Sequence, residues 1–270
     1  MKKQLQIKKE LISIVIPAYK QDETIVRDLL RIEQVLSELR YGFEIVVVVD
    51  GMQDKTFERA KKIKSKNIRV YGYETNKGKG YAVRYGMVRS RGSIIAFIDS
   101  GMDINPNGLS MLLEHFEWYN ADIIVGSKRH PASKINYPQE RRLVSFLSQI
   151  FIRVLFGLSV RDTQVGLKFF RREVVENVMP RLLVKKFAFD IEILVVAHHL
   201  GYKRIFEAPI NLTLNFSESI VSQHLFKILL YTLWDTLAIF YRLKIKRYYD
   251  DGRKREWKYD PDLNFRVNIG

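Results

Sequence analysis

Two carboxylates in the stretch Phe97 to Pro106 (FIDSGMDINP) stand where a divalent metal ion could bind. Asp99 ends an apolar run, and Asp103 follows after a turn that contains Gly101. Mg²⁺ and Mn²⁺ take oxygen ligands, usually one or two carboxylates together with phosphate oxygens of a substrate. Glycine allows the turn to curl back so that both carboxylates reach one ion, which would stabilise a diphosphate as a leaving group. The alternative is that Asp103 only caps the helix that begins near Pro106.

Other segments carry groups that could bind phosphate. The loop Asn76 to Gly80 (NKGKG) opens a helical segment, and backbone amides at such a place can hold an anion. Its spacing is not that of a nucleotide-triphosphate P-loop, and turn chemistry also explains its glycines. Four cations, which could bind phosphates or form a solvated basic face, follow another apolar run: Lys128, Arg129, Arg141 and Arg142.

A third group consists of polar residues set among bulky apolar ones. Such positions predict buried, paired side chains, because an unpaired charge is rarely buried. The spacing does not separate structural from functional pairing, although we favour a structural role for Asp162 and Lys168. The residues concerned are Asp162, Gln164, Lys168, Asp190 and Glu192.

The elements that must position these groups alternate along the first half of the chain. Apolar runs predict strands at Ile12–Tyr19, Glu44–Asp50, Ile68–Glu74, Ser93–Asp99 and Ala121–Ser127. Helical spacing and helix-start signals predict helices at Thr24–Leu39, Asp54–Ile63, Lys79–Ser90 and Pro106–Tyr119. This alternation predicts an α/β domain whose mostly parallel sheet is flanked by helices on both faces.

The strand ends carry the candidate functional groups. Ligands of such sheets bind beyond the carboxyl ends of the strands. Tyr19, Asp50, Asn76–Gly80, Asp99 and Lys128 all lie at or just after a predicted strand end. We therefore expect these residues to meet at one rim of the sheet.

The second half contains two long apolar segments that charged residues interrupt. They are Leu143–Leu158 and Ile220–Ile245, and both are too broken by charge to span a bilayer. Either could lie in a membrane interface or pack on the sheet; for the C-terminal one we favour the membrane. We expect an α/β domain over residues 1–215 and an amphipathic, membrane-associated C-terminal segment over 216–270, with a loosely held tail from Asp250.

The composition narrows the class of partner. The 270 residues carry a formal net charge of +15, which favours nucleic acid, an anionic membrane or phosphorylated ligands. Nucleic acid is disfavoured, because most aromatic residues lie among aliphatic ones, as core residues do. The chain has no cysteine, which excludes disulfides and thiolate metal sites. No signal-like apolar region follows the basic N-terminus, so we expect no secretory leader.

Taken in order, the motifs resemble a known family. They are IVIPAYKQDETI, VVVDGMQDKT, NKGKGYAVRYG, FIDSGMDINP, DTQVGLKFF and FDIEILVVAHHLGYKRIFEAPI. The pattern, from about Ile12 to about Ile220, resembles the family 2 inverting glycosyltransferases with the GT-A fold. Within that family it is most similar to the dolichol-phosphate mannosyltransferases and dolichyl-phosphate glucosyltransferases.

The resemblance implies a nucleotide-diphosphate sugar donor, Mg²⁺ or Mn²⁺, and a polyprenyl (dolichyl-type) phosphate acceptor at the cytoplasmic face of a membrane. It assigns Asp99 and Asp103 to catalysis and metal binding. It implies that Pro17, Ala18, Tyr19 and Asp50 line the nucleotide, and we add Gln21, Lys79 and Ser100 to the predicted nucleotide-binding residues. We predict phosphate or acceptor binding by Lys128, Arg129, Arg141, Arg142, Gln164, Asp190 and Glu192.

The sequence departs from the family pattern at positions that keep other functions open. Gly101 occupies the place of the second aspartate of the family's D-x-D motif, and Val49 that of the first aspartate of its Asp-Asp-Gly. One alternative is a glycosyltransferase with a soluble or protein-linked acceptor. Another is a non-catalytic protein that binds a nucleotide sugar.

Overall fold

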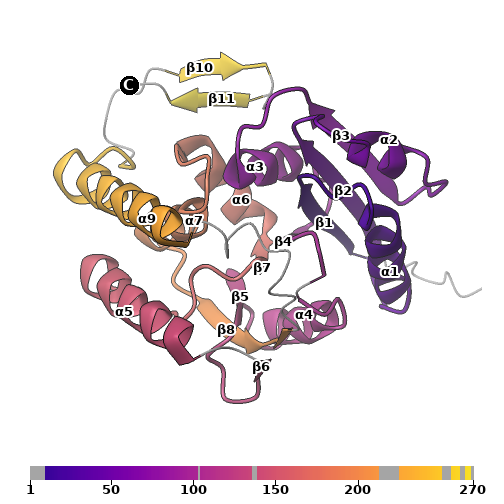
Figure 1. Ribbon diagram of the computed structural model, residues 1–270. Helices are drawn as coiled ribbons and strands as arrows, with labels where there is room; N and C mark the ends of the chain where they lie inside the picture. Colours follow the sequence, from indigo (N-terminus) through magenta and orange to yellow (C-terminus); the bar gives the residue numbers. More distant parts are fainter. Residues whose placement is uncertain are drawn as a thin grey trace, which may run out of the picture.

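The computed structural model describes residues 10–102, 104–135, 139–212, 225–250, 257–261 and 265–268. At its centre is a seven-stranded sheet with the order β3-β2-β1-β4-β7-β5-β8 (Figure 1). The strands are β1 (Leu11–Ala18), β2 (Gly42–Asp50), β3 (Ile68–Tyr73), β4 (Ile94–Ile98), β5 (Ile123–Ser127), β7 (Leu167–Arg171) and β8 (Ile205–Pro209). Every pair in the sheet is parallel except those that β7 makes with β4 and β5. The predicted α/β class with a mostly parallel sheet is confirmed.

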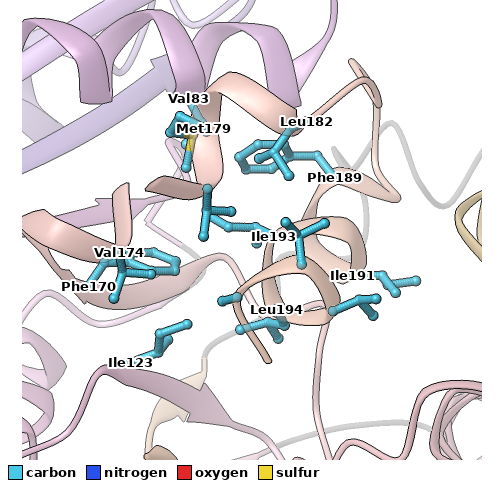
Figure 2. Close-up of a cluster of buried hydrophobic side chains, with 14 of the residues drawn as sticks. Val83, Ile123, Phe170, Val174, Met179, Leu182, Phe189, Ile191, Ile193 and Leu194 are labelled. Carbon is cyan, nitrogen blue, oxygen red and sulfur yellow. The ribbon is translucent and has the colours of Figure 1, made fainter. Parts of the chain in front are cut away.

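Helices cover both faces of the sheet because successive strand residues point to opposite sides. On β2, Val46 and Val48 belong to one hydrophobic cluster, and Ile45 and Val47 belong to another. The first cluster contains side chains of α3 (Lys79–Arg89), α6 (Arg172–Val178) and α7 (Phe189–His199). Figure 2 shows part of it, where side chains of these helices meet Ile123 and Phe170 of the sheet. The second contains side chains of α1 (Ile25–Ser37), α2 (Thr56–Lys61) and α4 (Gly108–Trp118).

The two apolar segments of the second half form helices that pack together. They are α5 (Gln139–Phe156) and α9 (Leu225–Phe240), and α9 continues into a π-helical turn, η2 (Tyr241–Ile245). The two helices lie near each other (Figure 1), and the ring centres of Phe156 and Phe240 are 6.3 Å apart. Ile239, Leu243 and Tyr249 are buried in the first cluster. One face of this C-terminal segment therefore packs on the α/β unit; the proposed division at about residue 215 stays a prediction.

Short elements complete the described chain. A parallel pair joins β6 (Lys134–Ile135) to β9 (Asn211–Leu212), and a single 3₁₀ turn, η1 (Met179–Arg181), follows α6. The expectation of a loose tail is wrong for β10 (Trp257–Asp260) and β11 (Phe265–Asn268), which pair antiparallel. Alternating apolar residues at Trp257 and Tyr259, and at Phe265 and Val267, are the strand signal there.

Across the described residues, none of the helices combines the length and the apolar run that crossing a bilayer takes.

Candidate active site

The carboxylate of Asp99 lies directly past the end of β4, as the sequence predicts. Its backbone N–H donates to the carbonyl oxygen of Gly166 at 2.8 Å, just before β7. A Cβ atom built on Gly166 would lie 1.8 Å from Oδ2 of Asp99. Any larger residue at position 166 would displace this carboxylate, so Gly166 is part of the site, although sequence reasoning did not select it.

Asp99 is one end of a chain of alternating charges. Nζ of Lys79, in the first turn of α3, lies 2.9 Å from Oδ1 of Asp99 and 3.0 Å from its Oδ2. The same ammonium lies 2.9 Å from Oδ2 of Asp190, in the first turn of α7. Oδ1 of Asp190 accepts a 2.5 Å bond from Nζ of Lys168, on β7. Four elements thus contribute one charge each to a connected network.

Exposure to solvent falls steadily along this network. The exposed fraction of the side chain is 41% for Asp99, 16% for Lys79, 3% for Asp190 and 0% for Lys168. Lys168 also donates to the carbonyl oxygen of Val165 at 2.6 Å. The rim end of the network can therefore contact a ligand, whereas Lys168 at its inner end is closed off from solvent; the structural role predicted for Lys168 stays a prediction.

The charges of the network shift one another's pKa values. Burial alone would lower the pKa of Lys79, but Asp190 and Asp99 outweigh it and raise that pKa above its ordinary value. Burial alone would raise the pKa of Asp190, but Lys168 and Lys79 outweigh it and lower that pKa. Burial lowers the pKa of Lys168, and Asp190 opposes that shift. Asp190 is therefore ionised at neutral pH and a weak base.

Asp50, at the end of β2, accepts hydrogen bonds from the Asn76–Gly80 loop. Its Oδ1 accepts from the Lys77 amide at 2.7 Å, and its Oδ2 accepts from the Gly78 amide at 2.9 Å and from Nδ2 of Asn76 at 3.1 Å. We expected these loop amides to hold an anion, and the anion that they bind here is the protein's own carboxylate. Gly78 has φ +98°, and a Cβ there would lie 2.6 Å from the carbonyl oxygen of Lys185. The loop that presents Lys79 is thus tied to β2 and packed against the segment before α7.

The first strand and the Asp99 turn meet through Gln21. Gly101 has φ +92°, and a Cβ built on it would have Oε1 of Gln21 as its nearest atom, at 3.8 Å. The backbone N–H of Gln21 donates to Oγ1 of Thr56 at 2.8 Å, and the Tyr19 hydroxyl donates to Oε1 of Gln53 at 3.1 Å. Pro17 and Ala18 end β1 next to them, and the half-buried Ser100 follows Asp99. The structure therefore brings Gln21 beside the Asp99 turn.

The basic residues after β5 are partly accounted for by contacts within the protein. The Lys128 amide donates to Oδ2 of Asp162 at 3.0 Å, and Nζ of Lys128 lies 3.7 Å from the same oxygen. Arg129 donates to Gln149 of α5, and its guanidinium carbon lies 5.7 Å from the centre of the Phe146 ring.

Two other basic residues fall in α5. Arg141 and Arg142 lie in its first turns, but their side chains are outside the described residues. Their assignment to phosphate binding stays a prediction.

The sequence predicts burial for both Gln164 and Glu192, but only Glu192 is buried. Gln164 is exposed, so the prediction of burial is wrong there; it lies in a turn before β7 rather than on the strand. Glu192 is fully buried, and its Oε2 accepts from the amides of Leu183 and Val184. Its Oε1 accepts from the Tyr249 hydroxyl at 2.7 Å, which ties the C-terminal segment to α7. Burial raises the pKa of Glu192.

The residues present fit a hard divalent cation at Asp99. Oδ1 of Asp99 is buried and accepts no hydrogen bond within the described chain, although the Lys79 ammonium lies near it. An oxygen of this kind is the donor that Mg²⁺ and Mn²⁺ prefer, and one carboxylate is enough when phosphates supply the other ligands. Among the residues that the structure describes, no group of three or more acidic or histidine side chains could hold a metal ion. Asp103, the second predicted ligand, lies outside the described residues.

Comparisons of sequence identify relatives of the chain. Residues 13–179, more than half of it, match the family model described as "Glycosyl transferase family 2". Dolichyl-phosphate beta-glucosyltransferase of Drosophila melanogaster is 32% identical over 205 residues, which cover 70% of this chain and 63% of the relative. The protein of the same name from Dictyostelium discoideum is 28% identical over 217 residues, which cover 75% and 66%. The human one is 29% identical over 230 residues, which cover 77% and 67%. The chain thus spans about two thirds of the length of these relatives.

Solved structures share the fold at lower identity. Mannosyl-3-phosphoglycerate synthase from Rubrobacter xylanophilus matches 96% of this chain and 86% of its own, with a TM-score of 0.68 and 15% identity. Glucosyl-3-phosphoglycerate synthase from Mycobacterium tuberculosis, in complex with Mn²⁺, uridine diphosphate and phosphoglyceric acid, matches 96% and 87%, with a TM-score of 0.62 and 18% identity. The strand-end arrangement and these matches agree, and the chain belongs to glycosyl transferase family 2, with the GT-A type of fold that its motifs predict.

Proposed function

We propose that this chain transfers a sugar from a nucleotide-diphosphate sugar to a polyprenyl (dolichyl-type) phosphate, with inversion and with Mg²⁺ or Mn²⁺. The relatives named above carry the acceptor part of this proposal, since dolichyl phosphate stands in their names. The Mn²⁺ and uridine diphosphate of the solved complex support the donor and the ion. The single observation that carries the site is the pairing of Asp99 with Lys79 at the rim of the sheet.

The donor would lie over this rim. Asp99 would hold the divalent ion, and Lys79, whose ammonium lies 2.9 Å from Oδ1 of Asp99, could neutralise an oxygen of the diphosphate. Gln21 lies near the same turn, Ser100 is part of it, and Tyr19 directly follows β1. When bound, the ion supplies positive charge that stabilises the leaving diphosphate.

The buried carboxylates of the site favour an acceptor that is already ionised. Transfer to a hydroxyl group requires a base to remove its proton. Asp190 is held between two lysines and its pKa is lowered, and both oxygens of Asp50 accept hydrogen bonds from the neighbouring loop. Neither is available as a base, whereas a phosphate monoester near neutral pH needs none.

The chemical step is a single displacement. An oxygen of the acceptor phosphate attacks the anomeric carbon of the sugar and forms the new C–O bond. The bond from that carbon to the diphosphate oxygen breaks, its electron pair stays on the diphosphate, and the nucleoside diphosphate leaves from the opposite face. No proton is transferred, so catalysis consists of positioning and of charge stabilisation by residues such as Lys79.

Incubation of the 270-residue protein with Mn²⁺, dolichyl phosphate and either UDP-[³H]glucose or GDP-[³H]mannose tests the proposal. We expect one donor to yield a labelled sugar phosphate that extracts into organic solvent, with the anomeric configuration opposite to that of the donor. Transfer only to phosphoglycerate or to a protein-linked sugar would assign a different acceptor. Binding of the donor with no transfer to any acceptor would indicate a non-catalytic protein.

Helices α5 and α9 support the membrane as the place of reaction. Large apolar side chains are exposed on both, away from the faces that pack on the sheet. On α5 they are Phe146, Leu147, Ile150 and Val154, and on α9 and η2 they are Leu230, Tyr231, Leu233, Trp234, Leu237, Tyr241 and Ile245. Lys244, Lys246 and Arg247 are exposed at the end of α9. Exposed apolar side chains next to basic ones are typical of helices that lie in a membrane interface.

Replacing Trp234 with Glu is expected to release the protein from vesicles of mixed neutral and anionic lipid by at least about tenfold, because Trp234 is 73% exposed and would insert at the interface. The measurement is co-sedimentation at low salt. Trp118→Glu is the matched control, since Trp118 is 86% exposed on α4, on another part of the surface. Equal loss of binding in both variants, or no binding of the unaltered protein, would contradict the placing of α9.

We propose the cytoplasmic face of the membrane, which suits a chain without cysteine.

A further inference from the structure

Lys79 provides the counter-charge of Asp99 in this structure. Its ammonium lies within 3.0 Å of both oxygens of Asp99, so the carboxylate proposed as the metal ligand already has a monovalent counter-ion. Lys79 donates a hydrogen bond to Oδ2 of Asp99, whereas Oδ1 is buried, accepts no hydrogen bond within the described chain and is held to the ammonium by charge alone. This contact would be lost when a doubly charged ion approaches the same oxygen, because like charges at such a distance repel strongly.

A second carboxylate keeps Lys79 at the site when Asp99 is taken. Oδ2 of Asp190 lies 2.9 Å from Nζ of Lys79, and Asp190 is itself held by the fully buried Lys168 at 2.5 Å. Asp190 is 3% exposed and cannot turn to solvent. The ammonium of Lys79 therefore needs only a small movement about Asp190 to leave Asp99, and it then faces the rim where the diphosphate is proposed to lie.

We propose that the ammonium of Lys79 neutralises Asp99 as long as no divalent ion is bound there. When a divalent ion binds Asp99, the ammonium moves away and pairs with the diphosphate of the donor. Asp190 and Lys168 are positioning residues that hold Lys79 within reach of both partners. This inference rests on the proposed function, because it takes Asp99 as the metal ligand and a nucleotide diphosphate as the donor.

The consequence is a coupling between ion and nucleotide. A divalent ion alone must displace Lys79 without giving it a new partner, so its binding to the empty site is weak. With a nucleoside diphosphate present, Lys79 gains a phosphate oxygen, and the ion binds more tightly. Because coupling between two sites is reciprocal, the ion must raise nucleotide affinity by the same factor.

The test measures Mn²⁺ affinity from the electron paramagnetic resonance signal of free Mn²⁺, without and with UDP or GDP, for the unaltered protein and for Lys79→Met. Without nucleotide, we expect Lys79→Met to bind Mn²⁺ at least about tenfold more tightly, because Asp99 is then free of its counter-ion. The increase in Mn²⁺ affinity caused by the nucleotide should shrink by a similar factor. A merely structural role for Lys79 would predict weaker Mn²⁺ binding in the variant.

Lys185→Met is the matched control. Lys185 is exposed, lies near the same loop, and forms no ion pair within the described residues, so its removal changes the net charge equally without freeing Asp99. Lys79→Arg keeps the charge, so it should bind Mn²⁺ alone weakly and show the nucleotide effect. Lys79→Gln removes the charge with a polar side chain; it should bind Mn²⁺ alone more tightly, and it serves as the test if Lys79→Met does not fold. Unchanged Mn²⁺ affinity in Lys79→Met, or equal tightening in Lys185→Met, would overturn the inference.

The outcomes separate this inference from the function on which it rests. If the unaltered protein and an Asp99→Asn variant bind Mn²⁺ equally in the presence of UDP and of GDP, the metal site itself is wrong. If the unaltered protein binds Mn²⁺ with nucleotide and Asp99→Asn does not, but Lys79→Met behaves like the unaltered protein, the metal site stands and the exchange of Lys79 is wrong.

Discussion

Replacing Asp99 with Asn is expected to lower the rate of sugar transfer by at least about a hundredfold while the protein stays folded. The amide keeps the shape of the side chain but removes the negative charge that would hold the divalent ion. The fold should tolerate it, because the side chain is 41% exposed and Lys79 keeps its contact with Asp190. Initial rates with saturating donor and acceptor, together with the urea midpoint of unfolding, check both halves of this expectation.

The control for Asp99→Asn is Glu176→Gln, which removes a carboxylate from α6. Glu176 is 62% exposed and its ion pair with Arg172 is long, at 3.5 Å, so its loss should change neither rate nor stability noticeably. Transfer by Asp99→Asn at the rate of the control would show that the ion, if one is used, binds elsewhere. A loss of rate that disappears at high Mn²⁺ concentration would indicate weakened rather than abolished binding.

Replacing Asp190 with Asn is expected to lower the free energy of unfolding by roughly 3 to 5 kcal/mol. Asp190 is the shared partner of two lysines, and Lys168 is fully buried, so the variant would leave a buried ammonium without its counter-charge. The double variant Asp190→Asn with Lys168→Met should recover part of the loss, because it removes the stranded charge. Urea unfolding at neutral pH measures the unaltered protein, Asp190→Asn, Lys168→Met and the double variant. A loss equal to the sum of the two single variants would rule out the coupling.

The comparison for Asp190→Asn is Asp122→Asn, which weakens an ion pair in which two guanidinium N–H groups of Arg204 donate to Oδ1 of Asp122. Arg204 is 48% exposed, so water can replace its partner, and the loss of stability should be much smaller than that of Asp190→Asn. The pH dependence differs too. Because the pKa of Asp190 is lowered from 3.8, its contribution is fully present above about pH 4 and is lost as the pH falls through the folded-state pKa. Asp190→Asn should lack this acid-dependent loss.

Local patterns in the sequence predict the parallel part of the sheet well. The apolar run of β4 ends at Ile98, so that Asp99 falls at the strand's end, as the run itself indicates. The same reasoning places Asp50 at the end of β2 and Lys79 at the start of α3. It works because strand and helix periodicities depend on residues only a few positions apart.

The insertion of β7 between β4 and β5 is outside the reach of those patterns. Its five residues, LKFFR, read as an apolar motif with a lysine inside, and nothing local indicates an antiparallel partner. The strand brings Lys168 into contact with Asp190, and it places Gly166, which directly precedes it, against the side chain of Asp99. A lysine in an apolar run indicates a buried ion pair, but it does not indicate the partner.

What the sequence by itself determined is the class of fold, the family, and the strand end that carries Asp99, because local periodicity and motif order are properties of neighbouring residues. Only the tertiary structure decided that Lys79 contacts both Asp99 and Asp190, although Asp190 lies 111 positions from Lys79 in the sequence. It also decided that Asp50 accepts from the loop amides that were expected to bind an anion. The physical reason is that electrostatic pairing and burial depend on distance in space, and strand order sets that distance.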